Sequence, residues 1–91
     1  MRKLEQSTQF KKDLLREGRG RNGPQLLSEL LPVLAALMAD EPLDPKYRNH
    51  PLTGNDLWDC HVRPDLVLLY LKPDPRTLKL ARLGSHSELG L

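Results

Sequence analysis

Hydrophobic positions recur with a helical period in the first half of the chain. A helix is predicted from about residue 8 to residue 18, with capping side chains at Ser7 and Thr8. A second, Leu-rich helix is predicted from residue 24 to about residue 40, and Pro32 inside it predicts a kink or a restart. The positions expected to face the core are Phe10, Leu14 and Leu15 in the first helix and Leu26, Leu27, Leu30, Leu31, Leu34, Leu37 and Met38 in the second.

The second half of the chain predicts a meander of three antiparallel strands. Its first strand, at residues 58–63, alternates apolar and polar side chains, which is typical of a half-buried strand and directs Trp58, Cys60 and Val62 into the core. An almost continuous apolar run at residues 66–71 is typical of a central strand that is covered on both faces. Residues 77–83 predict the third strand, and a short polar tail follows it.

These elements together predict an α+β fold. Residues 1–6 are expected to form an edge strand, and residues 41–55 an ordered loop between the second helix and the meander. The N-terminal strand and the two helices would then pack on an antiparallel sheet meander, with the helices on one face. At 91 residues the chain has the length of one domain, residues 1–91.

Composition excludes several classes of protein. A content of 38% hydrophobic and 29% charged residues is typical of a globular rather than a disordered chain. The longest apolar stretch, residues 26–39, is shorter than the roughly 20 residues of a membrane span, and it starts too far along the chain for a signal peptide. The single cysteine, Cys60, cannot form an internal disulfide, which fits a reducing cytosol. We therefore expect a cytoplasmic protein with no membrane partner.

Charge is segregated along the chain, although the net charge is only +2. Residues 1–21 hold seven basic and three acidic residues and carry a charge of +4. Residues 22–45 hold four acidic residues and no Lys or Arg, which gives −4. Residues 46–91 hold seven basic and five acidic residues, which gives +2. The basic cluster expected on or just beyond the first helix consists of Lys11, Lys12, Arg16, Arg19 and Arg21. Such a cluster binds phosphate backbones or an acidic protein, or it is simply a solvated helix face.

The three histidines lie in polar, turn-like neighbourhoods of the second half. Because alternate residues of a strand share one face, Asp59 and His61 leave the same side of the sheet, opposite Cys60. The loop before this strand and the tail after the last strand can both return beside that face. The residues expected to converge in one cleft are His50, Asp59, His61, Asp65 and His86, flanked by Arg63 and Arg82.

Two chemistries suit such a cluster. Histidine and aspartate are good ligands for zinc and other first-row metal ions. Alternatively, histidines can act as acid and base at neutral pH. Cleavage of RNA through its own 2′-OH needs a base, an acid and cations that stabilise the phosphorane. Residue spacing alone does not decide between these chemistries and three unrelated surface histidines.

Three histidine-containing segments resemble the YafQ branch of the RelE/ParE toxin superfamily, and the match runs almost end to end, including Phe10-Lys11-Lys12-Asp13. The segments are Asn49-His50-Pro51-Leu52, Asp59-Cys60-His61-Val62-Arg63-Pro64-Asp65-Leu66 and Arg82-Leu83-Gly84-Ser85-His86-Ser87-Glu88-Leu89. The resemblance implies a RelE-like fold and a bacterial type II toxin that cuts mRNA in the ribosomal A site. It also implies neutralisation by a cognate antitoxin, expected to be of the ribbon-helix-helix type.

The resemblance also implies roles for individual residues. Those similar to the family's catalytic set are His50, His61, Asp65 and His86, with His50 expected as general base and His86 as general acid. Together with the charge pattern, it leads us to expect RNA or phosphate contacts from Asp59, Arg63, Arg82, Lys11, Lys12 and Arg16. No metal ion and no other cofactor is implied.

One departure from the family pattern lies in the tail. The family commonly has a Phe after Ser-Glu-Leu, where this chain has Gly90 followed by Leu91. That Phe is associated with positioning the mRNA, so its absence predicts weaker cleavage or a partial replacement by Leu91. Two other functions stay open: a toxin of this fold that acts only by binding, like a gyrase inhibitor, and a metal-dependent nuclease.

Overall fold

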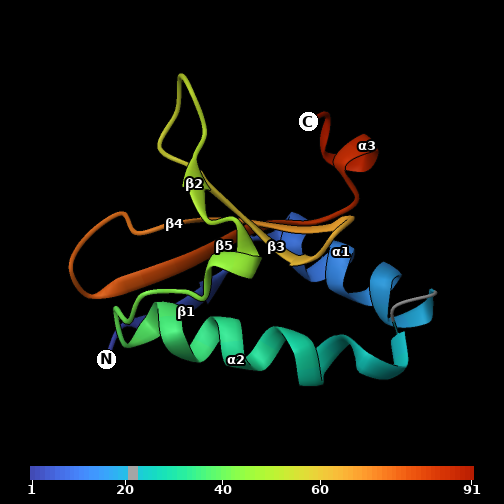
Figure 1. Ribbon diagram of the computed structural model, residues 1–91, viewed down its shortest axis with the longest axis horizontal. Coiled ribbons are helices and arrows are strands. Elements are labelled where there is room, and N and C mark those ends of the chain that lie inside the picture. The colour runs from blue at the N-terminus through green and yellow to red at the C-terminus, as the bar shows by residue number, and fades with distance from the viewer. Residues whose placement is uncertain (21–22) are drawn as a thin grey trace.

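A five-stranded sheet runs through the molecule, with strand order β1-β5-β4-β3-β2 (Figure 1). The computed structural model describes residues 1–20 and 23–91. Its strands are β1 (Lys3–Gln6), β2 (His50–Pro51), β3 (Trp58–Arg63), β4 (Leu66–Leu71) and β5 (Thr77–Gly84). Its helices are α1 (Thr8–Arg19), α2 (Leu26–Met38) and α3 (His86–Leu89), with short 3-10 turns η1 (Gly23–Gln25) and η2 (Pro45–Tyr47). The predicted α+β class is confirmed.

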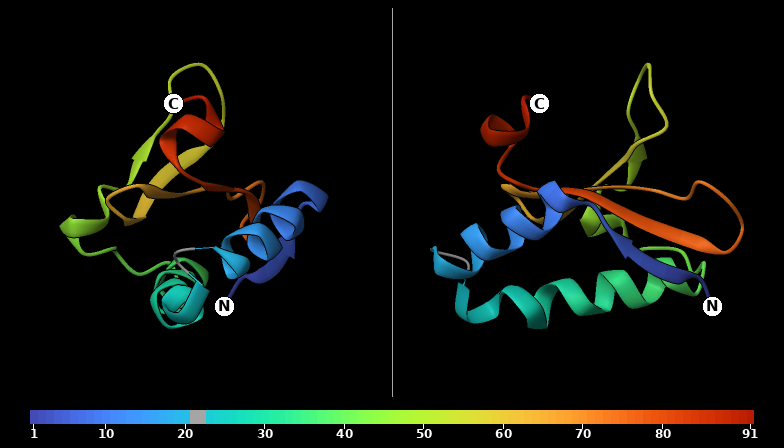
Figure 2. Two further views of the ribbon diagram at one scale, coloured as in Figure 1. Left: turned by 90° about the vertical axis from the view of Figure 1, so that its right-hand side faces the viewer. Right: turned by 180° about the vertical axis from the view of Figure 1, so that it is seen from behind.

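The elements form layers on the two sides of the sheet (Figures 1 and 2). Helices α1 and α2 cover one face, as predicted, while α3 and the segment around β2 lie on the other. Two of these elements were not predicted: α3 lies in the expected polar tail, and β2 lies in the expected loop. None of the described helices is long and apolar enough to cross a membrane.

The hydrophobic core lies between the two long helices and the sheet. It holds Phe10 of α1, five residues of α2, and the inward side chains of β3, β4 and β5. The core residues of α2 are Leu26, Leu30, Val33, Leu34 and Leu37. Leu27 and Leu31 were expected here, yet 58% and 56% of their surface is exposed, as is 63% of Leu15 in α1. Leucines occur all around α2, so their spacing does not reveal the buried side; Val33 was missed for the same reason.

Helix α2 continues through Pro32 without ending or restarting there. Pro32 is exposed, and the loss of one backbone hydrogen bond is tolerated at a position that water can reach. Trp58 is also more exposed than predicted, at 39%. It pairs with buried Tyr70 on the core face of the sheet, but it lies at the rim.

The sheet is mixed, which corrects the prediction of an antiparallel one. The meander of β3, β4 and β5 is antiparallel as predicted, but β1 pairs with β5 in parallel, from Lys3 opposite Thr77 to Gln6 opposite Leu80. Two helices and three other strands separate β1 from β5, so no tight turn fixes their relative direction. Strand β4 is central, and Leu66–Tyr70 is buried on both faces, as its apolar run predicts.

Candidate active site

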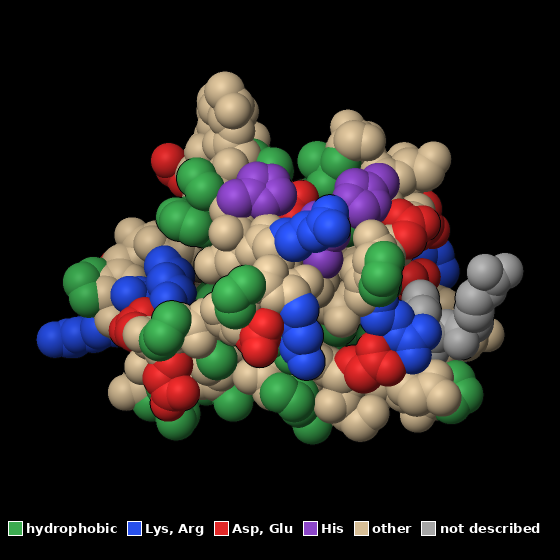
Figure 3. Space-filling view, in the orientation of Figure 1, with side chains coloured by type: hydrophobic (Ala, Val, Ile, Leu, Met, Phe, Trp, Pro, Cys, Tyr) green, Lys and Arg blue, Asp and Glu red, His purple; other side chains and the backbone are tan. Residues whose placement is uncertain are grey.

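Three separate segments bring the histidines together on the face of the sheet opposite α1 and α2. His50 begins β2, His61 lies in β3, and His86 begins α3. The ring centroids of His50 and His61 are 6.4 Å apart, and those of His61 and His86 are 4.9 Å apart in an edge-to-face arrangement. Figure 3 shows the histidine side chains gathered on one face, with a basic side chain beside them. His61 is therefore the middle member of a row of three imidazoles.

Asp59 lies under this row. Its side chain is almost fully buried, with Oδ1 3.2 Å from His61 Nε2 and Oδ2 4.0 Å from His50 Nε2. Although Oδ1 is close to His61, it has no hydrogen bond of good geometry from any described residue. Asp59 therefore places a buried acceptor against both His50 and His61.

His86 is held by its backbone and by its ring. Asp65 Oδ1 accepts a hydrogen bond from the His86 backbone N–H at 3.0 Å and from Nδ1 at 2.8 Å. The hydrogen bond from the imidazole, followed by that from the backbone, lowers the pKa of Asp65 below its ordinary value, so Asp65 is a carboxylate at neutral pH. Because a carboxylate only accepts, Nδ1 carries a proton and Nε2 is the atom left for other chemistry.

His50 is fixed in an analogous way, by a backbone carbonyl. Its Nδ1 lies 2.7 Å from the carbonyl oxygen of Arg48, which can only accept, so Nδ1 is again the protonated nitrogen. Arg48 has a φ of +48°, in the left-handed region that residues other than glycine seldom adopt. In the neutral form of His50, the lone pair is therefore on Nε2, on the side of Asp59 and His61.

Arg82, expected beside the histidines, is bound to helix α1. Its Nε donates to Asp13 Oδ2 at 2.8 Å, and Nη2 lies 3.4 Å from Asp13 Oδ1. Asp13 is completely buried and also accepts a hydrogen bond from the Leu83 N–H at 3.0 Å. Burial alone would raise the pKa of Asp13, but the hydrogen bonds from Arg82, Leu83 and Gln9 outweigh it, and the net pKa is lowered.

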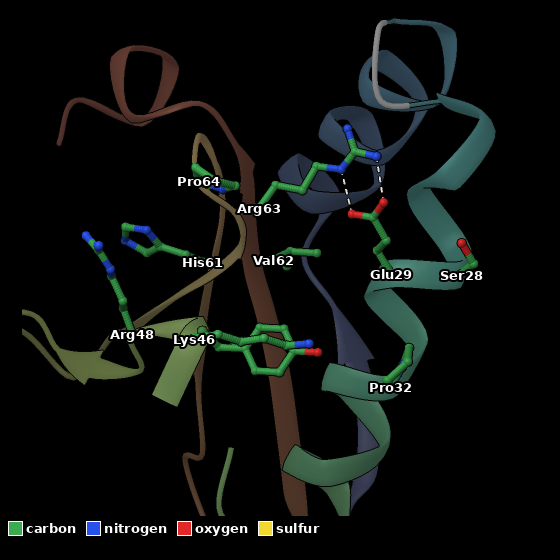
Figure 4. Close-up of a pocket in the computed structure, with 10 residues that line it drawn as sticks. Ser28, Glu29, Pro32, Lys46, Arg48, His61, Val62, Arg63 and Pro64 are labelled. Atoms are coloured by element: carbon green, nitrogen blue, oxygen red, sulfur yellow. Dashed lines mark hydrogen bonds and ion pairs between the residues drawn. The ribbon is translucent and has the colours of Figure 1, made fainter. Parts of the chain in front are cut away.

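Arg63 does not flank the histidines, which corrects its predicted position. Strict alternation would place it on the same face as His61, but β3 has a bulge there: His61 pairs with Val67, whereas Arg63 pairs with Leu66. The extra residue turns Arg63 to the helix face. Its guanidinium meets Glu29 of α2 in a two-point contact of 2.5 and 2.6 Å (Figure 4).

A cavity of about 610 Å³ lies between α2, η2 and β3, with His61 at its border (Figure 4). Lys46 and Arg48 lie on one side of it, and the Arg63–Glu29 pair and Pro32 lie on the other. The cavity therefore extends from the histidine row toward the helix layer, with basic side chains along its wall.

The basic residues of α1 divide into two kinds. Lys11 and Lys12 are exposed, as expected of residues that meet phosphates or solvent. Arg16 instead contacts Asp13, Leu83 and Glu88. Arg21, the last member of the predicted cluster, lies outside the described residues.

Asp13 and Glu88 were not identified from the sequence as parts of this region. Glu88 had a readable signal: Ser85-x-x-Glu88 is a capping box, and here the Ser85 hydroxyl accepts from the Glu88 N–H while the Glu88 carboxylate accepts from the Ser85 N–H. Gly90 ends this helix with a φ of +71°, a conformation that suits glycine. Asp13 gave no signal, because nothing in its neighbours indicates a buried carboxylate.

Cys60 is buried beneath the site, on the core side of β3. Burial, with a smaller contribution from Asp59, raises the pKa of its thiol to about 12. Cys60 is therefore a packing residue, as the alternation in β3 predicts. Among residues 1–20 and 23–91, no group of three or more His, Cys, Asp or Glu side chains is arranged to hold a metal ion.

A RelE-like arrangement of two helices on a sheet, with histidines on the opposite face, defines the class as a small bacterial toxin, and the comparisons identify the family. The family model described as "Bacterial toxin of type II toxin-antitoxin system, YafQ" matches residues 2–90, and the chain belongs to this family. It is 33% identical over 92 residues to the mRNA interferase toxin YafQ of Escherichia coli K12, covering 97% of this chain and 95% of that protein. The predicted toxin class and family are thereby confirmed.

Solved structures agree with this assignment. A copper-bound mutant toxin from Helicobacter pylori has a TM-score of 0.83 at 40% identity, covering 98% of this chain and 99% of that one. The E. coli DinJ-YafQ complex has a TM-score of 0.77 at 31% identity, covering 98% of both chains. A second crystal structure describes DinJ-YafQ as a toxin-antitoxin complex.

Proposed function

We propose that this toxin is an mRNA interferase that cuts translated message on the ribosome, in the cytoplasm, by acid–base catalysis without a metal ion. One observation carries the proposal: His50 and His86 flank His61, and each has its Nδ1 proton held by a fixed acceptor, so that both present Nε2. Cleavage through the 2′-OH requires two such groups, one to take a proton and one to supply it.

His50 is the general base and His86 the general acid in this proposal. His50 Nε2 takes the proton of the 2′-OH, the 2′-oxygen forms a bond to phosphorus, and the bond from phosphorus to the 5′-oxygen breaks. The proton on His86 Nε2 passes to the leaving 5′-oxygen. The Asp65 carboxylate accepts from His86 Nδ1 and holds the ring with Nε2 available to the leaving oxygen. The products are a 2′,3′-cyclic phosphate and a 5′-hydroxyl.

His61 and Arg82 stabilise the phosphorane between these two groups. His61 lies in the middle of the row, and the buried Asp59 carboxylate 3.2 Å from its Nε2 orients the ring. Arg82 acts from the edge of the site, in the orientation that Asp13 gives it.

Lys11 and Lys12 contact ribosomal phosphates in this proposal, so their contribution should fall with salt and should not depend on the message sequence. A ribbon-helix-helix antitoxin, whose acidic segment covers the basic surface, neutralises the toxin. The complex of DinJ with E. coli YafQ supports a partner of this general kind.

The decisive experiment maps the cut ends of ribosome-bound message with wild-type protein, His50→Ala and His86→Ala. Each substitution should lower cleavage by about 10²–10⁴-fold, the usual contribution of one acid or base, and the double variant should lose less than the product, because the two groups act as a unit. Both residues lie on the surface of the site, so the fold should persist. Asp56→Asn, an exposed carboxylate in the loop before β3, is the matched control.

Three results would contradict the proposal. Ends with a 5′-phosphate would exclude the 2′-OH as nucleophile. Unchanged rates in both histidine variants would mean that the row is not the catalyst. Loss of cleavage on chelation beyond the ribosome's own need for magnesium would favour a metal-dependent nuclease, a relevant alternative because related Helicobacter toxins were crystallised with metal. Growth arrest with intact message would favour a toxin that acts only by binding.

A further inference from the structure

Arg16 of α1 joins three elements through one guanidinium group. Its Nη1 lies 3.1 Å from Asp13 Oδ1, and its Nη2 donates to the backbone carbonyl of Leu83 in β5 at 2.9 Å. Its Nε lies 3.2 Å from Glu88 Oε2 in α3 and 3.5 Å from Glu17 Oε2. The side chain is 40% exposed, but each of its three guanidinium nitrogens already meets a protein oxygen.

Gly84 makes this connection possible. A Cβ atom at Gly84 would lie 2.9 Å from Arg16 Nη2 and 3.2 Å from Glu88 Oε1. The backbone of Gly84 is not in the left-handed region, so space, and not conformation, is what requires a glycine here. The Arg16 side chain passes over this residue to reach α3.

Glu88 links α1 to the first turn of α3. Its Oε1 accepts a hydrogen bond from the Ser85 N–H at 2.9 Å, while its Oε2 meets Arg16. Helix α3 has only four residues, far fewer than a helix needs to be stable in isolation. Its orientation therefore depends on side chains that tie it to the rest of the fold, and His86 is its first residue.

These contacts separate Arg16 from the lysines of the same helix. Three carboxylates and a carbonyl already contact the Arg16 guanidinium, and a phosphate would have to displace them. Lys12 is exposed, and its side chain is free to meet a phosphate.

We propose that Arg16 is a positioning residue: through Glu88 it fixes α3, and thereby His86, against the sheet. The inference rests on the proposed function for the role of His86 as acid, but the placement of α3 by Arg16 stands apart from that role. It revises the expectation that Arg16 binds RNA.

The activity test compares Arg16→Gln with Lys12→Gln in cleavage of ribosome-bound message over a salt series. Arg16→Gln should lower kcat by about 10-fold or more, because small displacements of a catalytic group are costly, with KM and its salt dependence unchanged. Lys12→Gln should raise KM and weaken the salt dependence, with kcat unchanged. Arg16→Lys, which keeps the charge opposite Glu88, should recover part of kcat. An Arg16→Gln variant with normal kcat and raised KM would overturn the proposal.

The structural test does not need cleavage. The backbone N–H groups of Leu89, Gly90 and Leu91 donate to Ser85, Ser87 and His86 carbonyls, so their hydrogen exchange reports the order of α3. Exchange should accelerate in Arg16→Gln and in Glu88→Gln, which retains a capping side chain, while Lys12→Gln should match the wild type. The His86 ring signals should shift in the same two variants.

Gly84→Ala tests the positioning role of Arg16 without replacing Arg16. Its methyl group should displace the flexible end of Arg16 while leaving Arg16 itself present, and α3 exchange should rise as in Arg16→Gln. Unchanged exchange in both Arg16→Gln and Gly84→Ala would refute the positioning role. If wild-type protein does not cleave message but α3 loosens in these variants, the proposed function fails and the positioning of α3 does not.

Discussion

Asp13 offers the strongest test of how the sheet edge is held. Strand β1 pairs with β5 only as far as Leu80, so the N–H of Leu83 would be an unpaired edge group. Asp13 accepts its hydrogen bond at 3.0 Å, in a buried position, and also binds Arg82 and Arg16. The Asp13→Ala substitution removes the acceptor for all of these donors at once.

The size of the loss follows from the burial of each donor. A buried N–H left without a partner costs about 1–3 kcal/mol. Arg82 and Arg16 are partly exposed and can regain water, so each of their ion pairs contributes about 0–1 kcal/mol. We expect Asp13→Ala to lower the free energy of unfolding by about 2–4 kcal/mol, which corresponds to a fall in Tm of roughly 10–30 °C in a domain of this size.

The loss of stability in Asp13→Ala should depend on pH. The pKa of Asp13 is lowered in the folded state, so its ionic contribution is fully present above the ordinary unfolded value of about 3.9 and is lost as the pH falls through the folded pKa. The difference in stability between wild type and Asp13→Ala should therefore be largest at neutral pH and should shrink below about pH 4.

Urea and thermal unfolding followed by circular dichroism, at neutral pH and near pH 3, measure both effects. The exposed Asp56→Ala should change stability by no more than about 0.5 kcal/mol and serves as control. A loss below about 1 kcal/mol at neutral pH, or a difference that is constant with pH, would refute the role assigned to Asp13.

Two further predictions concern the core. Cys60, with its thiol pKa raised to about 12 by burial, should resist a thiol reagent in the native protein and react at the rate of a free thiol in denaturant; rapid native reaction would contradict its burial. Leu30→Ala should cost about 2–5 kcal/mol, whereas Leu27→Ala on the exposed side of the same helix should cost about 0.5 kcal/mol or less. Equal losses of unfolding free energy for the two variants in urea would mean that a different face of α2 packs on the core.

The order of the elements could be predicted because each has a distinct local pattern. The alternation in β3 and the apolar run of β4 reflect burial directly. The parallel pairing of β1 could not be predicted, because it depends on which distant strand edge is open. The buried stripe of α2 was ambiguous because leucines occur on every side of that helix.

The candidate site, like the fold, could be predicted only in part from the sequence. That His50, His61 and His86 lie together followed from strand alternation and the two flanking segments, and the resemblance singled out the same residues. The bulge that turns Arg63 to Glu29, and the buried carboxylate that binds Arg82, depend on packing between segments remote in sequence. Neither has a local signal.

The position of β5 inside the sheet has a consequence for biosynthesis. Strand β5 lies between β1 and β4, and it pairs residues 3–6 with residues 77–80. Long-range pairing of this kind forms late and slowly, so a nascent chain that ends before residue 77 has a gap in its sheet and no His86 beside His61. Such a nascent chain therefore lacks both the complete sheet and the assembled histidine row, and the proposed function predicts that fragments released by premature termination do not cleave message.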